Sequence, residues 1–327
     1  MQSGQINAKV KTMKTLLKSL GVLAIIMIIP HGAVWADQTN YNIGKVGGSE
    51  LKIGLGARPV AMGEAFVAQA DDLNTTAWNP AGLSQISGIQ AGFMHNIYLQ
   101  ETSMEYVAYV QNLFTGAGLG ANVTYLNYGS LDKFDEVNGL PVAQGSFTPT
   151  VLTGTIGYGQ QVLPGLAIGA ALKMISQTID TEHYSAVAVD LGGLYKTGIT
   201  GLQLGLAVQN LGTQLAGADL PQNVKVGAAY LLPVKFASND SWNTVLDVNV
   251  PFGDTNYTAV NVGTEYWYNQ MVAGRVGYQI KNSGDLGGIT GLTAGAGVKV
   301  SMFQVDYALV SFGDLGLTHQ VAISVAF

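Results

Sequence analysis

The chain has 327 residues, a formal net charge of -6 and 11% charged residues, while 48% of its residues are hydrophobic. The charged fraction lies well below the ~25% of soluble domains, and the few Lys and Arg residues exclude the basic surface that nucleic-acid binding needs. The sequence has no cysteine, which excludes disulfide scaffolds and thiol catalysis. No internal apolar run reaches the ~18 residues of a membrane-spanning helix. Composition therefore leaves an unusually apolar soluble β protein or a membrane β-barrel.

Residues 1–36 have the pattern of a secretory signal peptide. Several lysines precede the apolar run LGVLAIIMII (20–29), and Pro30 ends this run. The small residue Ala36 indicates cleavage after it, which predicts a secreted protein; with the strand pattern described below, the expected location is the bacterial outer membrane. A membrane anchor is the alternative, but the apolar run is short. Met13 could be the true start, because MKTLLKSL is itself a usual opening.

Residues 37–86 lack clean strand alternation and contain the stretch GARPVAMGEAFVAQADDLNTTAWNPAGLS (56–84). Its many small residues tolerate a helix and would allow close packing. At its end, an asparagine can bond the nearby backbone, a proline fixes φ and a glycine permits a sharp bend. The sequence predicts a turn formed by Asn79, Pro80, Ala81 and Gly82.

From residue 87 onward, apolar residues alternate with small or polar ones, which is the period of a β-strand. The alternating segments run about ten to thirteen residues, enough to cross a bilayer when tilted, whereas strands of soluble sheets usually have about five or six. The even number of segments, fourteen, is typical of bacterial outer-membrane barrels. Strands are predicted near 87–100, 102–113, 117–128, 149–162, 165–179, 184–196, 200–211, 222–234, 241–252, 256–268, 270–281, 289–300, 302–312 and 317–327.

Loop lengths support a barrel independently of periodicity. If the first strand runs outward from the periplasm, the connections after odd-numbered strands are extracellular and should be the longer ones. The three longest connections, 129–148, 212–221 and 282–288, all fall in this class. Most periplasmic connections are tight, and 235–240 is a moderate exception.

Charged strand residues fall on the polar face of their strands, which predicts that they point into the barrel. They are Lys173, Asp190, Lys225, Asp247, Glu265, Arg275, Lys299 and Asp306. Because unpaired buried charges are costly, a paired interior network is expected. The segment 37–86 adds four charges that could pair with those of the wall, namely Arg58, Glu64, Asp71 and Asp72.

A barrel of fourteen strands is too wide for its own side chains to fill, so residues 37–86 are expected to form a hatch in the lumen. Small inward side chains such as Gly205, Ala207, Gly295 and Gly297 would leave room for a ligand or for movement of the chain. Tyr266, Trp267 and Tyr268 at a strand end predict an interfacial aromatic ring, with ordinary strand-end packing as the alternative.

Three blocks carry a resemblance to a known family: GARPVAMGEAFVA (56–68), WNPAGL (78–83) and VDYALVSFGDLGLTHQVAISVAF (305–327). They resemble the PorV/PorQ family of outer-membrane proteins, which is related to FadL-type long-chain fatty-acid transporters. The resemblance implies a barrel closed by an N-terminal hatch, whose Asn-Pro-Ala motif corresponds to Asn79, Pro80 and Ala81. It also implies that Phe327 is the C-terminal signal for the outer-membrane assembly machinery, a partner besides outer-membrane lipid.

Other motifs predict no further chemistry. The G-x-G at 54–56 lacks the third glycine of a nucleotide-binding loop, and His95, His183 and His319 lie too far apart in sequence to predict a zinc site. The acidic run LDKFDEVNG (131–139) could hold calcium, but its spacing is not that of an EF-hand, and a solvated loop is the preferred interpretation. No nucleophile elbow or catalytic carboxylate pair is present. We therefore expect no enzyme, no cofactor and no metal.

The sequence thus predicts an all-β protein: a transmembrane antiparallel β-barrel of about 14 strands at 87–327 with a hatch at 37–86. Two functions of different classes remain open. The barrel could pass or bind a hydrophobic small molecule. It could instead be an accessory of type IX-like protein secretion that docks a secreted protein or a secretion complex. A structural barrel without transport is a third possibility.

Overall fold

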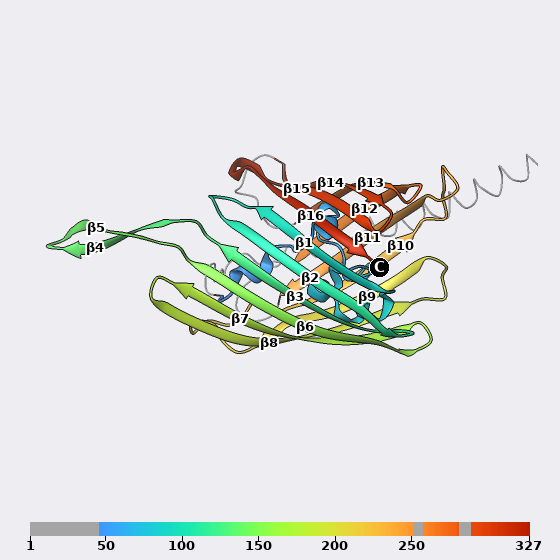
Figure 1. Cartoon of the computed structure of the whole chain (residues 1–327), viewed down its shortest axis with the longest axis horizontal. Coiled ribbons are helices and arrows are strands. Elements are labelled where there is room, and N and C mark those ends of the chain that lie inside the picture. The colour runs from blue at the N-terminus through green and yellow to red at the C-terminus, as the bar shows by residue number, and fades with distance from the viewer. Residues whose placement is uncertain (1–45, 252–257, 281–288) are drawn as a thin grey trace, which may run out of the picture.

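The computed structural model describes residues 46–251, 258–280 and 289–327, so the predicted signal peptide and the 282–288 connection lie outside the described residues. Fourteen strands close into an antiparallel barrel in the order β1-β16-β15-β14-β13-β12-β11-β10-β9-β8-β7-β6-β3-β2 (Figure 1). Each coincides with a predicted strand to within a few residues, and the predicted fourteen-stranded barrel is confirmed. The strands are β1 Ile89–Ile97, β2 Ser103–Phe114, β3 Ala117–Asn127, β6 Thr150–Leu163, β7 Leu166–Ile179, β8 Glu182–Lys196, β9 Leu202–Gly212, β10 Asn223–Leu231, β11 Ser241–Pro251, β12 Ala259–Tyr268, β13 Val272–Ile280, β14 Thr290–Val300, β15 Phe303–Phe312 and β16 Leu317–Ala326.

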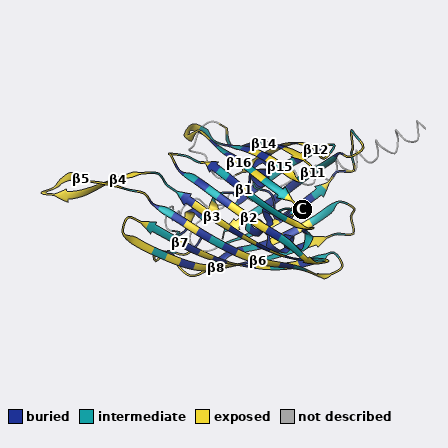
Figure 2. Cartoon of the chain, in the orientation of Figure 1, coloured by how far each residue is buried: buried dark blue, intermediate teal, exposed yellow. Residues whose placement is uncertain are grey.

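The two faces of the wall differ in chemistry, as alternation requires. In β3, Leu119, Val123 and Tyr125 are exposed on the outside, while Asn122 and Thr124 between them are buried. The same banding of exposed and buried residues runs along the other strands (Figure 2). An apolar exterior around a polar interior is the pattern of a barrel that faces lipid. Since such barrels carry their longer loops outside, we call the end bearing the 128–149 connection the extracellular end.

The longest connection contains two further strands, β4 Leu131–Val137 and β5 Leu140–Phe147, which pair only with each other. This hairpin is exposed almost throughout and projects far beyond the barrel (Figure 1). Its turn, Asn138-Gly139, has positive φ at both residues (53° and 79°), as the Asn-Gly hairpin signal predicts. The segment 131–139 is therefore exposed to solvent, as expected, but it forms part of a β-hairpin and not an irregular loop. No group of His or acidic side chains in the described ranges could hold a metal ion, so the calcium alternative gains no support.

Residues 46–88, here called the lumenal segment, lie inside the barrel and pack against its inner face (Figure 1, blue). The segment begins at the extracellular end, where the Gly47 amide donates to the Asp219 carbonyl, and leads into β1 at the opposite, periplasmic end. It holds four short helices: η1 Ser49–Lys52, α2 Ala57–Ala61, α3 Thr75–Trp78 and η2 Pro80–Gln85. Of the helices in the described ranges, none has the length and apolarity to cross a membrane.

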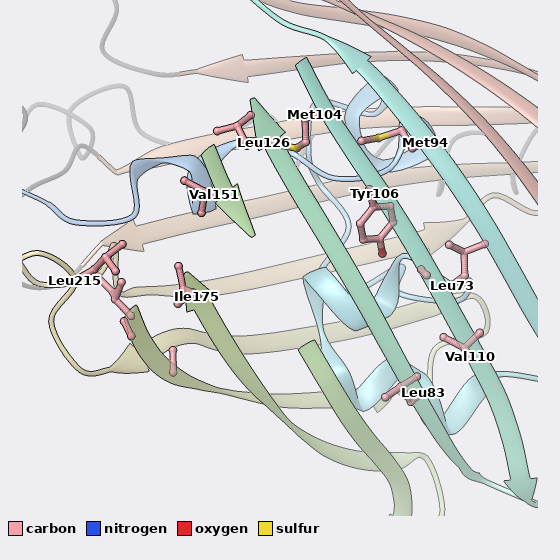
Figure 3. Packing of buried hydrophobic residues seen from close by; sticks show 14 of the residues in the cluster. Leu73, Leu83, Met94, Met104, Tyr106, Val110, Leu126, Val151, Ile175 and Leu215 are labelled. Atoms are coloured by element: carbon pink, nitrogen blue, oxygen red, sulfur yellow. The ribbon is translucent and has the colours of Figure 1, made fainter. Parts of the chain in front are cut away.

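Apolar side chains of the lumenal segment pack against inward-facing residues of the wall. Leu73 and Leu83 belong to one buried cluster with Met94, Tyr106 and Val110 of β1 and β2 (Figure 3). Smaller clusters form around Phe66 and Trp78 and around Val60. The barrel thus has a core, and the lumenal segment supplies its centre.

The turn that contains Asn79 and Pro80 rests on inward glycines of three neighbouring strands. A Cβ atom added to Gly169 would lie 2.4 Å from the Ala81 nitrogen, and one added to Gly192 would lie 2.1 Å from the Asn79 side-chain oxygen. A Cβ on Gly159 would likewise meet the Pro80 carbonyl at 2.4 Å. These positions therefore need glycine because the turn approaches the wall so closely.

Close approach of the lumenal segment also explains other small inward residues, which were expected to leave room for a ligand. A Cβ on Gly205 would meet the Val67 carbonyl oxygen at 2.4 Å, and one on Gly295 would meet the Ala61 Cβ at 2.5 Å. Gly297 faces the side chains of Arg275 and Asp306 instead. That space is occupied by the protein itself, so the expectation was wrong at these glycines.

We expect Gly192→Ala to lift the turn from the wall and to lower the free energy of unfolding by about 1–3 kcal/mol. The neighbouring variant Gly193→Ala is the control, because a Cβ there meets no atom within 4 Å. Urea unfolding in micelles and limited proteolysis of residues 46–88 would measure both effects. Identical behaviour of the two variants would contradict the close seating of the turn.

Candidate functional site

The lumenal segment separates two cavities inside the barrel. The outer cavity, near the extracellular end, has a volume of about 250 Å³. It is lined by residues 50–55 of the segment and by residues of β2, β3, β6, β7 and β9 through β12. The inner cavity, near the periplasmic end, has a volume of about 220 Å³ and is lined by charged side chains such as Asp71, Asp72 and Lys299. Residues 50–55, 64, 77 and 78 of the segment line the outer cavity, and residues 57, 58 and 71–74 line the inner one.

Asn79 joins separate parts of the lumenal segment to the wall. Its side-chain amide donates to the carbonyls of Val67 (2.7 Å) and Gly193 (3.2 Å), and its side-chain oxygen accepts from the Ala81 amide at 3.1 Å. The last bond caps η2, whose first residue is Pro80. Asn79 is fully buried, so each of these bonds is made without competition from water. The predicted turn residues are thus brought together at the wall.

Gly82 follows at a point where no larger residue fits. A Cβ there would lie 2.0 Å from the Thr75 hydroxyl oxygen and 2.2 Å from the Ala70 carbonyl oxygen. The Thr75 hydroxyl in turn donates to the Asn79 carbonyl at 2.6 Å. Asn79 and Gly82 thus make specific contacts within the segment, and Asn79 also contacts the wall.

Arg58 connects the lumenal segment to a chain of ion pairs on the wall. It forms a bidentate pair with Glu265 of β12 (2.8 Å for both bonds) and contacts Asp71 at 2.6 Å and Asp72 at 2.8 Å. Burial lowers the pKa of Arg58, but the carboxylates of Asp71, Glu265 and Asp72 outweigh it and raise this pKa well above its ordinary value. The guanidinium therefore remains charged inside the lumen.

The chain of ion pairs continues around the wall. Arg275 of β13 contacts Glu265 at 2.7 Å and Asp306 of β15 at 2.7 Å, and its guanidinium lies over the ring of Trp267 at 5.3 Å. Trp267 is therefore a lumenal residue, and its predicted place in an interfacial ring was wrong because it shares the inward parity of Glu265. The aromatic cluster at this end comprises Phe236, Trp242 and Tyr266.

The remaining inward charges have more local partners. Lys173 pairs with Asp190 at 2.7 Å, and Asp247 accepts hydrogen bonds from the successive amides of Phe66 (2.7 Å) and Val67 (2.8 Å). Lys225 lies 4.4 Å above the Trp78 ring. Glu64 lines the outer cavity and Lys299 lines the inner one, and neither forms an ion pair within the part of the chain that the structure describes.

Uncharged polar residues of the wall also hold the segment, and sequence analysis did not single them out. The Thr293 hydroxyl accepts from the Gly63 amide at 2.9 Å and donates to the Ala61 carbonyl at 3.0 Å. Carbonyls of the segment also accept from Gln203, Gln209 and Gln320. All four residues have inward parity, so a search for uncharged polar residues on that face would have found them.

The other predicted positions lie away from the cavities. The Phe327 amide donates to the Ile89 carbonyl at 2.8 Å, at the periplasmic end where β1 meets β16, and its side chain is exposed. His95 pairs with Glu105 at 2.6 Å, whereas His183 and His319 contact Thr178 and Tyr307. The three histidines therefore do not converge on a single site.

We expect Arg58→Met to lower the free energy of unfolding by about 3–5 kcal/mol, because it leaves buried carboxylates without their partner. Adding Glu265→Gln and Asp72→Asn to this variant should restore part of the loss. Lys196→Met, at an exposed position at the end of β8, is the control. Urea unfolding in micelles would measure all three proteins, and equal midpoints for Arg58→Met and Lys196→Met would show that the network does not hold the segment.

Comparison with known proteins supports this architecture. The fold is similar to that of the toluene transporter TbuX from Ralstonia pickettii, with 13% identity, a TM-score of 0.58 and coverage of 84% of this chain and 98% of that one. It is also similar to the toluene transporter TodX from Pseudomonas putida (16%, 0.56, 83% and 97%) and to a FadL homologue from Pseudomonas aeruginosa (10%, 0.50, 81% and 96%). Because these sequence identities are low, the likeness shows a shared fold and nothing more.

Sequence comparison gives a family but no characterised relative. No curated protein matches the chain. A family model matches residues 31–327, which is nearly the whole chain. The chain therefore belongs to the uncharacterised protein family UPF0164.

Proposed function

We propose that this protein is an outer-membrane channel of FadL-like architecture that passes small hydrophobic molecules. The observation that carries the proposal is the division of a lipid-facing barrel into two cavities by a segment held through discrete polar contacts. Leu51, Ile53 and Trp78 give the outer cavity an apolar wall, which favours an apolar solute. The fold likeness to two toluene transporters supports the same class of cargo.

In this proposal the lumenal segment acts as the hatch. Its seat on the wall is specific, because Asn79, Arg58 and Asp247 each fix a different part of it. Passage of a solute requires some of these contacts to open. The signal peptide with cleavage after Ala36 and the role of Phe327 as assembly signal belong to the same proposal and remain predictions.

Uptake of labelled toluene by bacterial cells with an intact outer membrane would test the channel. We expect cells that produce this protein to take up toluene faster than cells that produce a barrel-matched porin at equal abundance. Equal rates would overturn the channel proposal.

The hatch is tested separately in planar bilayers. We expect the double variant Asn79→Ala/Pro80→Ala to raise ion conductance, because it removes the cap of η2 and the bonds to Val67 and Gly193. The control Asn138→Ala/Pro141→Ala makes the same two changes in the exposed hairpin. Unchanged conductance in the first variant would count against a hatch that the turn holds shut.

The β4–β5 hairpin favours a second candidate function. Its exposed apolar side chains include Phe134 and Leu140 (60% and 67% exposed), which belong to none of the buried clusters of the described residues, and they offer a surface for another protein. The resemblance to PorV/PorQ proteins points to a docking role of this kind in protein secretion. Replacing 131–147 by a short flexible linker should then abolish a stoichiometric protein companion in native mass spectrometry. Toluene uptake should be unchanged, since the hairpin lies outside the lumen.

A further inference from the structure

The β4–β5 hairpin leaves both of its edges open. Its two strands pair only with each other, and the hairpin projects beyond the barrel, so no other strand of the described residues lies beside either edge (Figure 1). A free edge presents backbone donors and acceptors, to which an extended chain can add as a further strand. The two edges differ in how well they can accept such a strand.

The register of the hairpin determines which backbone groups point to the free edges. The two residues that flank the two-residue turn form a hydrogen-bonded pair in this turn type. Along an antiparallel ladder, hydrogen-bonded pairs alternate with pairs that are not hydrogen-bonded. Glu136 with Pro141, and Phe134 with Ala143, are therefore of the second kind. Their backbone groups point away from the partner strand, toward the free edges.

Proline blocks one of these edges and leaves the other open. Pro141 has no amide hydrogen, so the free edge of β5 lacks a donor there. On the free edge of β4, Phe134 and Glu136 both keep their amides. The Glu136 amide donates to the side chain of Asp135 at 2.8 Å, an exposed bond that an added strand can replace. The free edge of β4 is therefore the one that can accept a strand.

The two faces of the hairpin differ in chemistry. Side chains alternate between faces along a strand, so Asp132, Phe134 and Glu136 of β4 share one face, here called the acidic face. The opposite face, here called the apolar face, exposes four apolar side chains, namely Leu131, Val137, Leu140 and Val142. A third strand would continue both faces. Alternation of two residue types in that strand would therefore suit the hairpin.

The charge of β4 selects the partner. Lys133 is the one basic residue in 131–147, and it pairs with Asp180 of the β7–β8 turn. Asp132, Asp135 and Glu136 form no ion pair within the described ranges. Antiparallel pairing of two β4 strands centred on Phe134 would place Asp132 opposite Glu136 twice, and like charges directly opposite are destabilising. A second copy is therefore disfavoured, and a basic strand is favoured.

We propose that the free edge of β4 accepts an extended segment of another protein as a third strand, in which basic and apolar residues alternate. The basic side chains of this segment lie beside Asp132 and Glu136 on the acidic face. Its apolar side chains extend the apolar face beside Val137. This inference rests on the second candidate function, the docking of a protein, and names the mode of docking and the chemistry of the partner.

The test measures the binding of fluorescent octapeptides to the full-length protein in phosphatidylcholine nanodiscs by fluorescence anisotropy. A peptide of four Lys-Val repeats has the proposed alternation. Four Glu-Val repeats reverse its charge, and four lysines followed by four valines keep its composition without alternation. We expect the Lys-Val peptide to bind at least about tenfold more tightly than either control. The protein with 131–147 replaced by a flexible linker gives the background.

Methylation of the peptide backbone tests strand addition itself. The amides of successive residues in a strand point to opposite edges, so N-methylation of every lysine blocks one edge of the peptide and N-methylation of every valine blocks the other. We expect one methylated peptide to lose at least about tenfold in affinity and the other to bind like the parent. Equal affinities of the two methylated peptides would overturn strand addition.

Phe134→Pro and Ala143→Pro are matched variants, because the two residues lie opposite each other and each change removes an amide that points to a free edge. We expect Phe134→Pro to weaken binding of the Lys-Val peptide at least about tenfold and Ala143→Pro to leave it unchanged. Phe134→Ala keeps the amide and should stay within about threefold of the unchanged protein. Asp132→Asn/Glu136→Gln should reduce the preference for Lys-Val over Glu-Val.

Equal effects of the two proline variants, or equal binding of the Lys-Val and Glu-Val peptides, would overturn the inference. A dimer in native mass spectrometry that Phe134→Pro dissociates would assign the edge to a second copy and would overturn it as well. The result is separable from the docking test. Loss of the protein companion on removal of 131–147 without selective peptide binding would leave docking standing and remove strand addition. Selective peptide binding without a companion would do the reverse.

Discussion

A chain that runs through a closed barrel without forming a strand must find partners there for its backbone polar groups. The helices of the lumenal segment are too short to satisfy these groups internally. The wall supplies what is missing, since Asp247 accepts from two successive amides and Thr293 both accepts and donates. Carbonyls are covered by glutamines from β9 and β16. The polar side chains of the inner face are thus placed to bond the backbone of the lumenal segment along the path that it takes.

Ion pairs also hold the lumenal segment to the wall, and their network reaches more strands than a single hydrogen bond does. Arg58 joins the lumenal segment to Glu265, and Glu265 is shared with Arg275, so the segment is connected to β12, β13 and β15 at once. Buried ion pairs contribute little net stability compared with apolar packing, but they strongly disfavour structures in which a partner is missing. They therefore specify where the segment sits more than how tightly it binds. The packing of Leu73, Leu83 and Phe66 contributes hydrophobic stabilisation, which does not depend on direction.

Alternation in the sequence was enough to locate all fourteen barrel strands, because a wall with lipid on one side and a filled lumen on the other imposes a strict period of two. The β4–β5 hairpin was missed as a pair of strands because it has no buried face, and only Asn138-Gly139 indicated it. Parity placed the inward charges, whereas the choice of partners depends on strands distant in sequence, as with Arg58 and Glu265. The inward glycines could be recognised as contact points only once the path of the lumenal segment was known.

The lumenal segment precedes every strand that it contacts, and its partners extend to the last one: the Gln320 side chain of β16 donates to the Gly54 carbonyl. Separations of this size make the native contacts expensive in loop entropy and slow to form. The pairing of β1 with β16 joins the first barrel strand to the last, so the wall closes around the segment that leads into its own first strand.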